Sequence, residues 1–274
     1  MTRLDALEAD LDRVPGTVSI WYGRPGGPAA FVREPAAPHY AASLMKVAVL
    51  LALYRGGYPL DVEVPVHNEF ASAAPGGGRF GCRESYDSDP LVWRRVGGSA
   101  PLGWLAERMI VASSNLATNL VLERVGLPAV ADALSAAGSV DSTVVRGIED
   151  TAAADAGLTN LVTAADLAKL LGGLELCTVA APQACAAMLV TLRAQQHAED
   201  LAAGLPPGTP VALKNGWIMG VRHAAGVIFP PGEPPYVLAV CASTPLAVNR
   251  HDDEACQLVA RVSAAAWADR LTLP

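Results

Sequence analysis

The chain has 274 residues, of which 51% are hydrophobic and 17% are charged, and its formal net charge is −7. This length and composition allow one large domain, or two closely joined lobes, with a substantial core. The acidic balance argues against nucleic acid or an anionic membrane as a partner, and no apolar run reaches the roughly 18 residues of a membrane span.

The first eleven residues form a charged amphipathic pattern that predicts a helix and lacks the form of a secretory signal peptide. The cysteine count is odd, the spacing is wide and no Cys-x-x-Cys pair occurs, which favours reduced thiols. We therefore expect a cytoplasmic protein, although a signal peptide removed from a mature chain is compatible with the same sequence. The cysteines are Cys82, Cys177, Cys185, Cys241 and Cys256.

Two strands and a buried helix are predicted next. Residues 17–22 and 29–32 form a hairpin pattern around a turn rich in proline and glycine. Residues 41–54 are apolar on almost every face, which is typical of a helix that runs through the middle of a fold. The Gly56-Gly57 pair marks its end.

The middle of the chain is predicted to be mostly helical. Residues 58–100 give irregular signals, and their glycine run lacks the Gly-Lys-Ser/Thr of a phosphate-binding loop, so we interpret them as a surface loop. The connection 146–161 has no clear period, and such long connections are often functional. Helical spacing of apolar residues recurs at 101–111, 115–125, 128–137, 163–171 and 182–195.

Strands return in the last third of the chain. We predict strands at 210–214, 223–229 and 236–242, a turn at 230–235 and a closing helix over 252–269. Elements from both chain ends therefore enclose a helical middle, which indicates an α+β fold: an antiparallel sheet flanked by helices, plus an inserted all-helical lobe. We expect one domain over 1–274, with an α/β lobe at about 1–57 and 196–274 and a helical lobe at about 58–195.

Ser43 and Lys46 stand at the start of the buried helix, three residues apart and on one face. Desolvation disfavours a charged lysine, and a neutral amine can accept the serine proton, so the pair has the form of an activated nucleophile. The alternative is a capping serine beside a lysine that reaches solvent. The chain has three lysines against seventeen arginines, and arginine is too basic to act as the base.

Two further motifs accompany this pair: Ser113-Ser114-Asn115, between two predicted helices, and Lys214-Asn215-Gly216, at the end of a predicted strand. Taken alone, the first resembles an ordinary helix cap and the second a turn. In this order and context the three motifs resemble those of the penicillin-recognising serine enzymes, class A β-lactamases in particular, which read Ser-x-x-Lys, Ser-Asp-Asn and Lys-Thr/Ser-Gly. The resemblance covers nearly the whole chain and implies the fold of that family.

The resemblance also implies residue roles. Ser43 becomes acylated with Lys46 as the candidate base, and Ser113 passes a proton to the leaving nitrogen with help from Lys214. The backbone N–H groups of Ser43 and Trp217 form an oxyanion hole beside Gly216. Substrate binding falls to Asn115, Asn215, Gly216, Trp217 and Arg222, where Asn115 holds an amide and Arg222 meets a carboxylate.

Three departures from the family pattern affect these roles. Ser114 replaces an aspartate, and Asn215 replaces a hydroxyl that contacts the substrate carboxylate. The loop motif Arg-x-Glu-x-x-Leu-Asn is not intact, because the chain reads Arg146-Gly147-Ile148-Glu149-Asp150. We therefore treat Glu149 as a catalytic candidate for deacylation, with a solvated loop carboxylate as the alternative.

The resulting function hypothesis is a serine hydrolase that opens a β-lactam or related amide through an acyl-serine intermediate. The alternatives are an amidase, esterase or acyltransferase on another substrate, and a penicillin-binding sensor that deacylates slowly. The expected partner is a small molecule that carries a carboxylate, and no cofactor is expected. The histidines look scattered along the sequence, without the close pairing of a zinc site, so no metal site is predicted. They are His39, His67, His197, His223 and His251.

Overall fold

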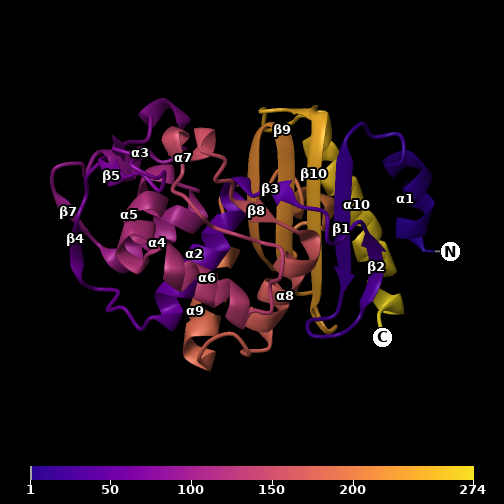
Figure 1. The fold of residues 1–274 in the computed structure, drawn as a ribbon. Coiled ribbons are helices and arrows are strands. Elements are labelled where there is room, and N and C mark those ends of the chain that lie inside the picture. The colour runs from indigo at the N-terminus through magenta and orange to yellow at the C-terminus, as the bar shows by residue number, and fades with distance from the viewer. Residues whose placement is uncertain (1) are drawn as a thin grey trace.

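A four-stranded antiparallel sheet forms one half of the computed structural model, which describes residues 2–274 (Figure 1). The strand order is β2-β1-β10-β9. Strands β1 and β10 come from opposite ends of the chain and pair from Thr17↔Ser243 to Gly23↔Val237, so both ends complete one sheet, as predicted. The bounds are β1 (Thr17–Gly23), β2 (Ala29–Arg33), β9 (Val211–Ile228) and β10 (Tyr236–Val248).

Helices cover both faces of this sheet. Figure 1 shows α1 and α10 on the outer face and α8 between the sheet and the helical half. Side chains alternate along β1, so that Val18, Ile20 and Tyr22 enter the outer core against Val259 and Val262 of α10. Burial of these faces supplies the hydrophobic driving force that holds the layers together. The bounds are α1 (Arg3–Leu11), α8 (Ala164–Glu175) and α10 (Glu254–Asp269).

The central helix α2 (Met45–Arg55) is buried from Met45 through Leu53, as its all-round apolar sequence predicts. It is entered through a 3₁₀ turn, η1 (Ala42–Leu44). Four helices of the helical half pack around α2: α4 (Leu102–Val111), α5 (Asn115–Val125), α6 (Leu127–Ala136) and α9 (Pro182–Arg193). This burial leaves any polar side chain between Met45 and Leu53 without solvent.

The two connecting regions contain short elements. Residues 58–101 contain two pairs of short strands, β4 with β7 and β5 with β6, and a short helix. The 146–161 connection contains one turn of helix and leads into a short strand. In chain order these are β3 (His39–Tyr40), β4 (Glu63–Pro65), β5 (Phe70–Ala71), β6 (Arg79–Phe80), η2 (Glu84–Tyr86), α3 (Pro90–Trp93), β7 (Ser99–Pro101), α7 (Thr151–Asp155) and β8 (Leu161–Val162). β3 pairs with β8, which ties the 146–161 connection to the segment that precedes η1.

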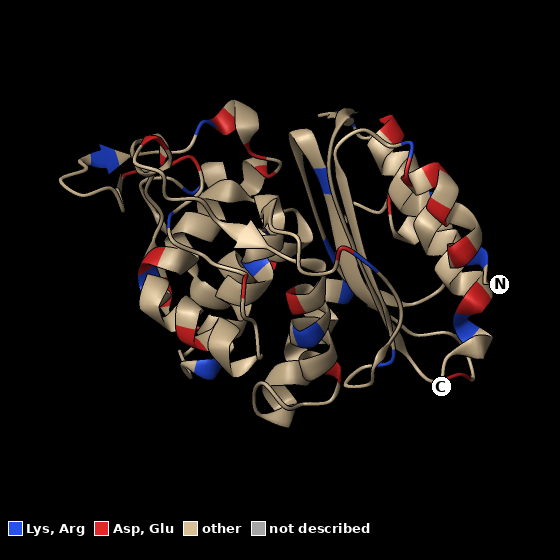
Figure 2. Cartoon of the chain, turned by 45° about the vertical axis from the view of Figure 1, so that its right-hand side comes forward, with Lys and Arg blue, Asp and Glu red and all other residues tan. Residues whose placement is uncertain are grey.

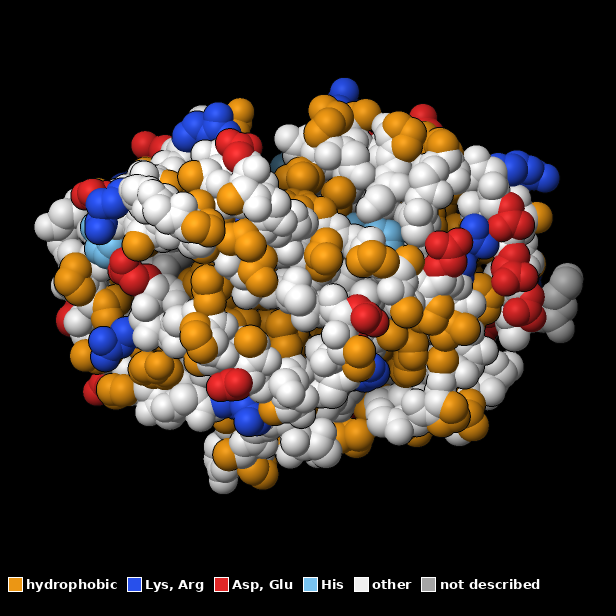
Figure 3. Space-filling view, viewed as in Figure 1, with side chains coloured by type: hydrophobic (Ala, Val, Ile, Leu, Met, Phe, Trp, Pro, Cys, Tyr) orange, Lys and Arg blue, Asp and Glu red, His pale blue; other side chains and the backbone are white. Residues whose placement is uncertain are grey.

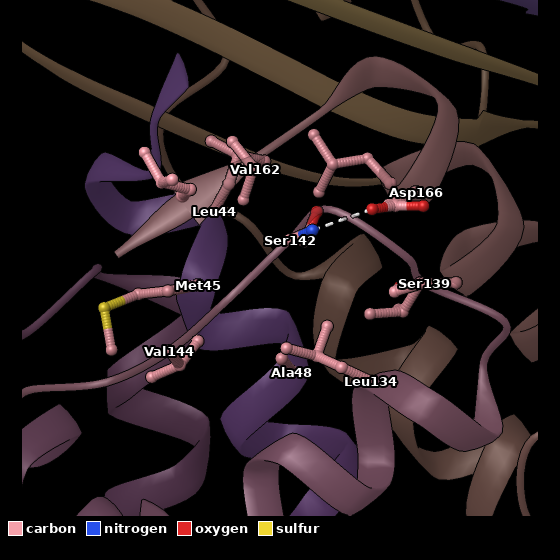
Figure 4. A pocket seen from close by; sticks show the side chains of 12 residues that line it. Leu44, Met45, Ala48, Leu134, Ser139, Ser142, Val144, Val162 and Asp166 are labelled. Atoms are coloured by element: carbon pink, nitrogen blue, oxygen red, sulfur yellow. Dashed lines mark hydrogen bonds between the residues drawn. The ribbon is translucent and has the colours of Figure 1, made fainter. Parts of the chain in front are cut away.

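A small apolar pocket lies beside the start of α2 (Figure 4). Leu44, Met45 and Ala48 form one wall, and the Asp166 carboxylate accepts the Ser142 backbone N–H at 2.8 Å on the other side. The pocket contains no nucleophile with a base beside it. Its role is to pack the loop before β8 against α2.

The segment labelled β9 contains both strands that were predicted at 210–214 and 223–229. Its two ends lie side by side, because the Phe229 N–H donates to the Pro210 carbonyl at 3.0 Å and a Cβ atom at Gly226 would lie 2.9 Å from the Ala212 carbonyl oxygen. β9 (Val211–Ile228) therefore doubles back on itself, and its second half pairs with β10 from Tyr236↔Ile228 to Ser243↔Val221. The turn before β10 and the closing helix agree with the predictions.

The expected division into lobes remains a prediction, and the helix contacts bear on it. α8, from the expected helical lobe, packs on β1, β9 and β10. α2, from the expected α/β lobe, packs among the helices of the other half. Both helices therefore lie at the junction of the two halves.

Charged side chains lie mainly on the outer helices and loops (Figure 2). On the face shown in Figure 3, acidic and basic side chains are interspersed. Two cations, Lys214 and Arg222, lie inside the otherwise uncharged strand β9, and both are fully buried. None of the helices described within 2–274 is both long and apolar enough to cross a membrane.

Candidate active site

Ser43 lies where η1 meets the inner face of β9. A Cβ atom at Gly216 would come within 2.6 Å of the Ser43 backbone nitrogen, so only glycine permits this approach of the two chains. Ala42, immediately before Ser43, has φ of 44°, a conformation that costs energy for a residue with a side chain. The fold therefore holds the Ser43 backbone in a strained turn against β9.

Ser113 connects Ser43 with Lys46. The Ser113 hydroxyl donates to the Ser43 Oγ at 3.1 Å, and the Lys46 Nζ donates to the Ser113 Oγ at 3.1 Å. Ser113 has φ of 57° in the break between α4 and α5, which turns its side chain toward α2. The expected contact between Ser43 and Lys46 is thus made through Ser113, in a chain of three groups.

Lys46 is fully buried, and its Nζ also donates to the Ser113 carbonyl at 2.6 Å and to the Asn115 Oδ1 at 3.0 Å. Desolvation lowers the pKa of Lys46 from 10.5 to about 7, against an opposing effect of the Asp87 carboxylate. At pH 7 about half of the amine is then neutral, compared with about one part in three thousand for an ordinary lysine. The group is therefore suited to accept a proton at neutral pH.

Lys214 is the second buried lysine of this region. Its Nζ donates to the Asn215 carbonyl at 2.8 Å, and burial, together with the nearby Lys46, holds the pKa of Lys214 well below its usual range. Two ammonium groups in one dry region disfavour each other's charge. Lys46 therefore adds to the effect of burial in disfavouring the charged form of Lys214.

These residues face a cleft of about 690 Å³ between the helical half and the end of β9. Non-glycine residues with positive φ are rare, and six occur among residues 2–274. Four of the six line this cleft, which concentrates backbone strain at the candidate site. They are Ala42, Ser113, Glu149 and Asn249.

Glu149 lines the same cleft, whereas Asp150 does not. Arg83 holds the Glu149 Oε2 through its backbone N–H at 3.1 Å and its Nε at 3.2 Å. The Glu149 Oε1 is buried and has no protein hydrogen-bond partner. The Asp150 carboxylate is fully used, because it caps α7 at Ala153 and accepts from Ser72 and Ala73.

Asn115 and Trp217 also line the cleft. The Asn115 amide is fixed at both ends, because its Oδ1 accepts from Lys46 and its Nδ2 donates to the Tyr86 carbonyl at 3.1 Å. Trp217 follows Gly216, so its backbone N–H belongs to the segment of β9 that approaches Ser43. These placements are compatible with the roles that the family resemblance implies.

Two predicted substrate-binding residues are not brought to the cleft. Consecutive strand residues point to opposite faces, and the Asn215 amide donates to Asp200 and to the His197 carbonyl, away from Ser43. Arg222 is fully buried, pairs with Asp200 at 3.2 Å and donates to the Arg250 carbonyl. In this structure both side chains contact Asp200 and neither lines the cleft, and the substrate-binding roles of Asn215 and Arg222 stay predictions.

Asp87 is a site residue that sequence reasoning missed. Its Oδ2 accepts from the Ser114 hydroxyl at 3.1 Å, from the Leu116 N–H at 2.8 Å and from the Trp93 Nε1 at 3.0 Å. It thereby places a carboxylate beside the start of α5, close to where the resembling enzymes carry aspartate at position 114. In the sequence, only the serine at position 114 indicated that the usual carboxylate is missing there. It did not indicate which distant residue supplies a carboxylate instead.

The histidines also required a correction. The rings of His197 and His251 stack with centroids 6.0 Å apart, and both contact the Trp217 ring edge to face. His39 and His223 form a second pair at 5.3 Å. The expectation that the histidines lie scattered is therefore wrong, because the fold joins residues more than fifty positions apart.

Comparisons with known proteins agree with this geometry. Residues 2–269 match the profile of the Beta-lactamase enzyme family. The structure resembles that of a β-lactamase from Sphaerobacter thermophilus, with 25% identity, a TM-score of 0.79 and coverage of 99% of this chain and 98% of that one. It also resembles PBP-A, with 21% identity, a TM-score of 0.80 and coverage of 99% and 96%. A third similar structure is a β-lactamase from Xanthomonas campestris, with 20% identity, a TM-score of 0.81 and coverage of 98% and 97%. No curated protein sequence matches the chain.

Proposed function

Because the chain belongs to the Beta-lactamase enzyme family, we propose that it is a serine hydrolase whose Ser43 is acylated by a β-lactam or a related amide. The observation that carries the proposal is the hydrogen-bonded chain from the half-buried Ser43 through the buried Ser113 to the buried Lys46. One of the similar structures is described as an acyl-enzyme complex of PBP-A with penicillin G, which gives a precedent for acylation in this fold.

Acylation begins when the Ser43 Oγ attacks the amide carbon. The Ser43 proton passes to the Ser113 Oγ, and the Ser113 proton passes to the neutral Lys46 Nζ, over two contacts of 3.1 Å. The C–N bond then breaks, and the leaving nitrogen takes a proton from the Ser113 hydroxyl while Lys46 returns its proton to Ser113. The product is an ester on Ser43 and a released amine end.

The tetrahedral intermediate carries a negative oxygen that requires donors. The backbone N–H groups of Ser43 and Trp217 fill this role, and the close approach at Gly216 brings their two chain segments together. One such donor typically contributes roughly 3 kcal/mol to transition-state stabilisation. The strained turn at Ala42 keeps the Ser43 N–H in place before substrate arrives.

Deacylation requires a water molecule and a base, and Glu149 is the candidate. Its Oε1 lacks a protein donor and is available as an acceptor, while Arg83 fixes the Oε2. Glu149 stands one position late relative to the family's loop motif, and a misplacement of about 1 Å can cost about 100-fold in rate. We therefore expect deacylation to be slower than acylation, so that the acyl-enzyme accumulates.

Intact-protein mass spectrometry over time with a small β-lactam panel tests the proposal. The expected result is a mass increase of one covalent adduct in the wild-type protein and none in Ser43→Ala, with Ser19→Ala as a matched control that is labelled normally. Ser19 is a buried serine bonded to His39, outside the cleft. Undiminished labelling of Ser43→Ala would contradict the proposal.

A second candidate function is hydrolysis or transfer of an amide or ester that lacks the β-lactam carboxylate. It is favoured by the orientation of Asn215 and Arg222, which both bind Asp200 and leave the carboxylate subsite without them. An activity-based phosphonate probe that labels Ser43, together with no labelling by any β-lactam, would select this candidate.

A further inference from the structure

A cluster of possible metal ligands lies at the mouth of the cleft. His197, Glu199 and His251 each offer one ligand atom, and these atoms lie within 4.8 Å of one another. The His251 Nδ1 is 3.5 Å from the Glu199 Oε1, close to the separation of about 3.4 Å that two ligands of a tetrahedral Zn²⁺ show at bond lengths near 2.1 Å. The chemical class of the cluster, two imidazoles and one carboxylate, is typical of zinc sites that keep an open position.

His197 has the features of a preformed ligand. Its Nε2 is buried and has no hydrogen-bond partner, which is costly for a polar atom. An imidazole whose Nε2 has no protein partner can offer the lone pair of that nitrogen to an ion when its proton is on the Nδ1.

The Trp217 side chain packs against both imidazoles of the cluster. The packed Trp217 ring, 5.1 Å from His197 and 5.4 Å from His251, restricts both imidazoles.

The local charge balance also bears on an ion. Arg222 lies 4.8 Å from the Trp217 ring and repels a cation, but its charge is paired with the buried Asp200. Glu199 is exposed and adds one negative charge directly to the cluster. Glu199 and His251 are both exposed.

We propose that His197, Glu199 and His251 form a binding site for a zinc-class divalent cation at the mouth of the cleft. His251 and Trp217 line the cleft, so the position left open by three protein ligands faces the substrate space. If the proposed serine hydrolase function holds, an ion there supplies the positive charge for a substrate carboxylate that Arg222 does not supply. Ion binding itself is independent of that function.

Calorimetric titration of chelator-treated protein with Zn²⁺, and the visible absorption of the Co²⁺ form, test the site. All variants carry Cys177→Ser, because that exposed thiol is a competing zinc ligand. The expected result is one ion per chain. His197→Ala and His251→Ala should weaken binding by at least about tenfold, and Glu199→Gln should weaken it less.

His67→Ala is the matched control. His67 is a half-exposed histidine that contacts a carboxylate, Glu123, at 3.0 Å, but it belongs to no three-ligand cluster, so its removal should leave the affinity unchanged. Binding that survives both His197→Ala and His251→Ala, or no stoichiometric binding by the parent protein, overturns the proposal. Circular dichroism of the ion-free proteins shows whether each variant is folded. Because His251 is exposed, His251→Ala should fold and can test the site even if His197→Ala unfolds.

A separate measurement tests the carboxylate role. Zn²⁺ should accelerate labelling of Ser43 by a penicillin in the Cys177→Ser protein and not in its His251→Ala derivative. If zinc binds stoichiometrically without this acceleration, the proposed metal site is supported and its role in substrate recognition is rejected. Failure of penicillin labelling with and without zinc would count against the proposed function and leave the ion titration unaffected.

Discussion

The two walls of the cleft differ in what they have kept of the family pattern. On the helical wall, Ser43, Ser113 and Lys46 form a continuous chain of contacts in a dry environment. On the β9 wall, Asn215 and Arg222 turn to the buried Asp200. The residues for nucleophilic attack and the residues for substrate recognition are therefore separable. The first set depends on local helix geometry, and the second depends on which face of a strand a side chain occupies.

The largest expected effect concerns the base on the helical wall. Lys46→Arg should reduce the acylation rate by about 100-fold to 10,000-fold, because arginine stays protonated and cannot accept the proton. In the wild-type protein the rate should rise with pH through about 7, where the amine becomes neutral. Rapid-mixing measurements with a fluorescent penicillin report both quantities.

A control for this prediction is Lys169→Arg, at an exposed lysine paired with Asp166 on α8. It should leave the acylation rate unchanged. If Lys46→Arg retains most of the rate, then Lys46 acts only as a fixed charge and the proton goes elsewhere.

The next effect concerns deacylation. Glu149→Gln should lengthen the lifetime of the acyl-enzyme by about tenfold or more, since general-base catalysis contributes at least that much. Asp150→Asn should leave the lifetime unchanged, because the Asp150 carboxylate is occupied by Ser72, Ala73 and Ala153. Mass spectrometry after removal of excess penicillin measures both lifetimes. If only Asp150→Asn lengthens the lifetime, then Asp150 and not Glu149 is the base for deacylation.

A smaller effect is expected at Asp87, which raises the pKa of Lys46 through its negative charge. Asp87→Asn removes that charge, so the pKa of Lys46 should fall further and the midpoint of the pH–acylation profile should move downward by up to about one unit. Glu84→Gln, an exposed acid in the same loop, serves as the control and should not move it. An upward shift would show that Asp87 acts through the position of Ser114 and not through its charge.

The smallest expected effect concerns recognition of a substrate carboxylate by the β9 wall of the cleft. In ion-free protein, a β-lactam and its methyl ester should acylate Ser43 at rates within about threefold of each other, because a solvent-accessible charge contact contributes under about 1 kcal/mol. Arg222 is held by Asp200 and does not reach the carboxylate. Comparison of kcat/KM for the two compounds measures this, and a strong preference for the free acid would mean that a cation does face the substrate.

Local patterns in the sequence anticipated much of the fold. The all-apolar period of residues 45–53 predicts a buried helix, and helix α2 is buried there. The hairpin at the start of the chain and the strands near its end indicated a sheet built from both ends, which the β1–β10 pairing confirms. The two strands predicted at 210–214 and 223–229 lie side by side within β9, because the Phe229 N–H donates to the Pro210 carbonyl at 3.0 Å.

The sequence by itself determined the nucleophile motif, since Ser43 and Lys46 are one helical turn apart and their proximity follows from the helix period. Only the tertiary structure decided that Ser113 bridges them, that Asn215 and Arg222 face Asp200, and that His197 meets His251 across Trp217. These contacts join segments that lie up to seventy positions apart along the chain. Their geometry is set by how the sheet and the helices pack, and no local pattern in the sequence carries that information.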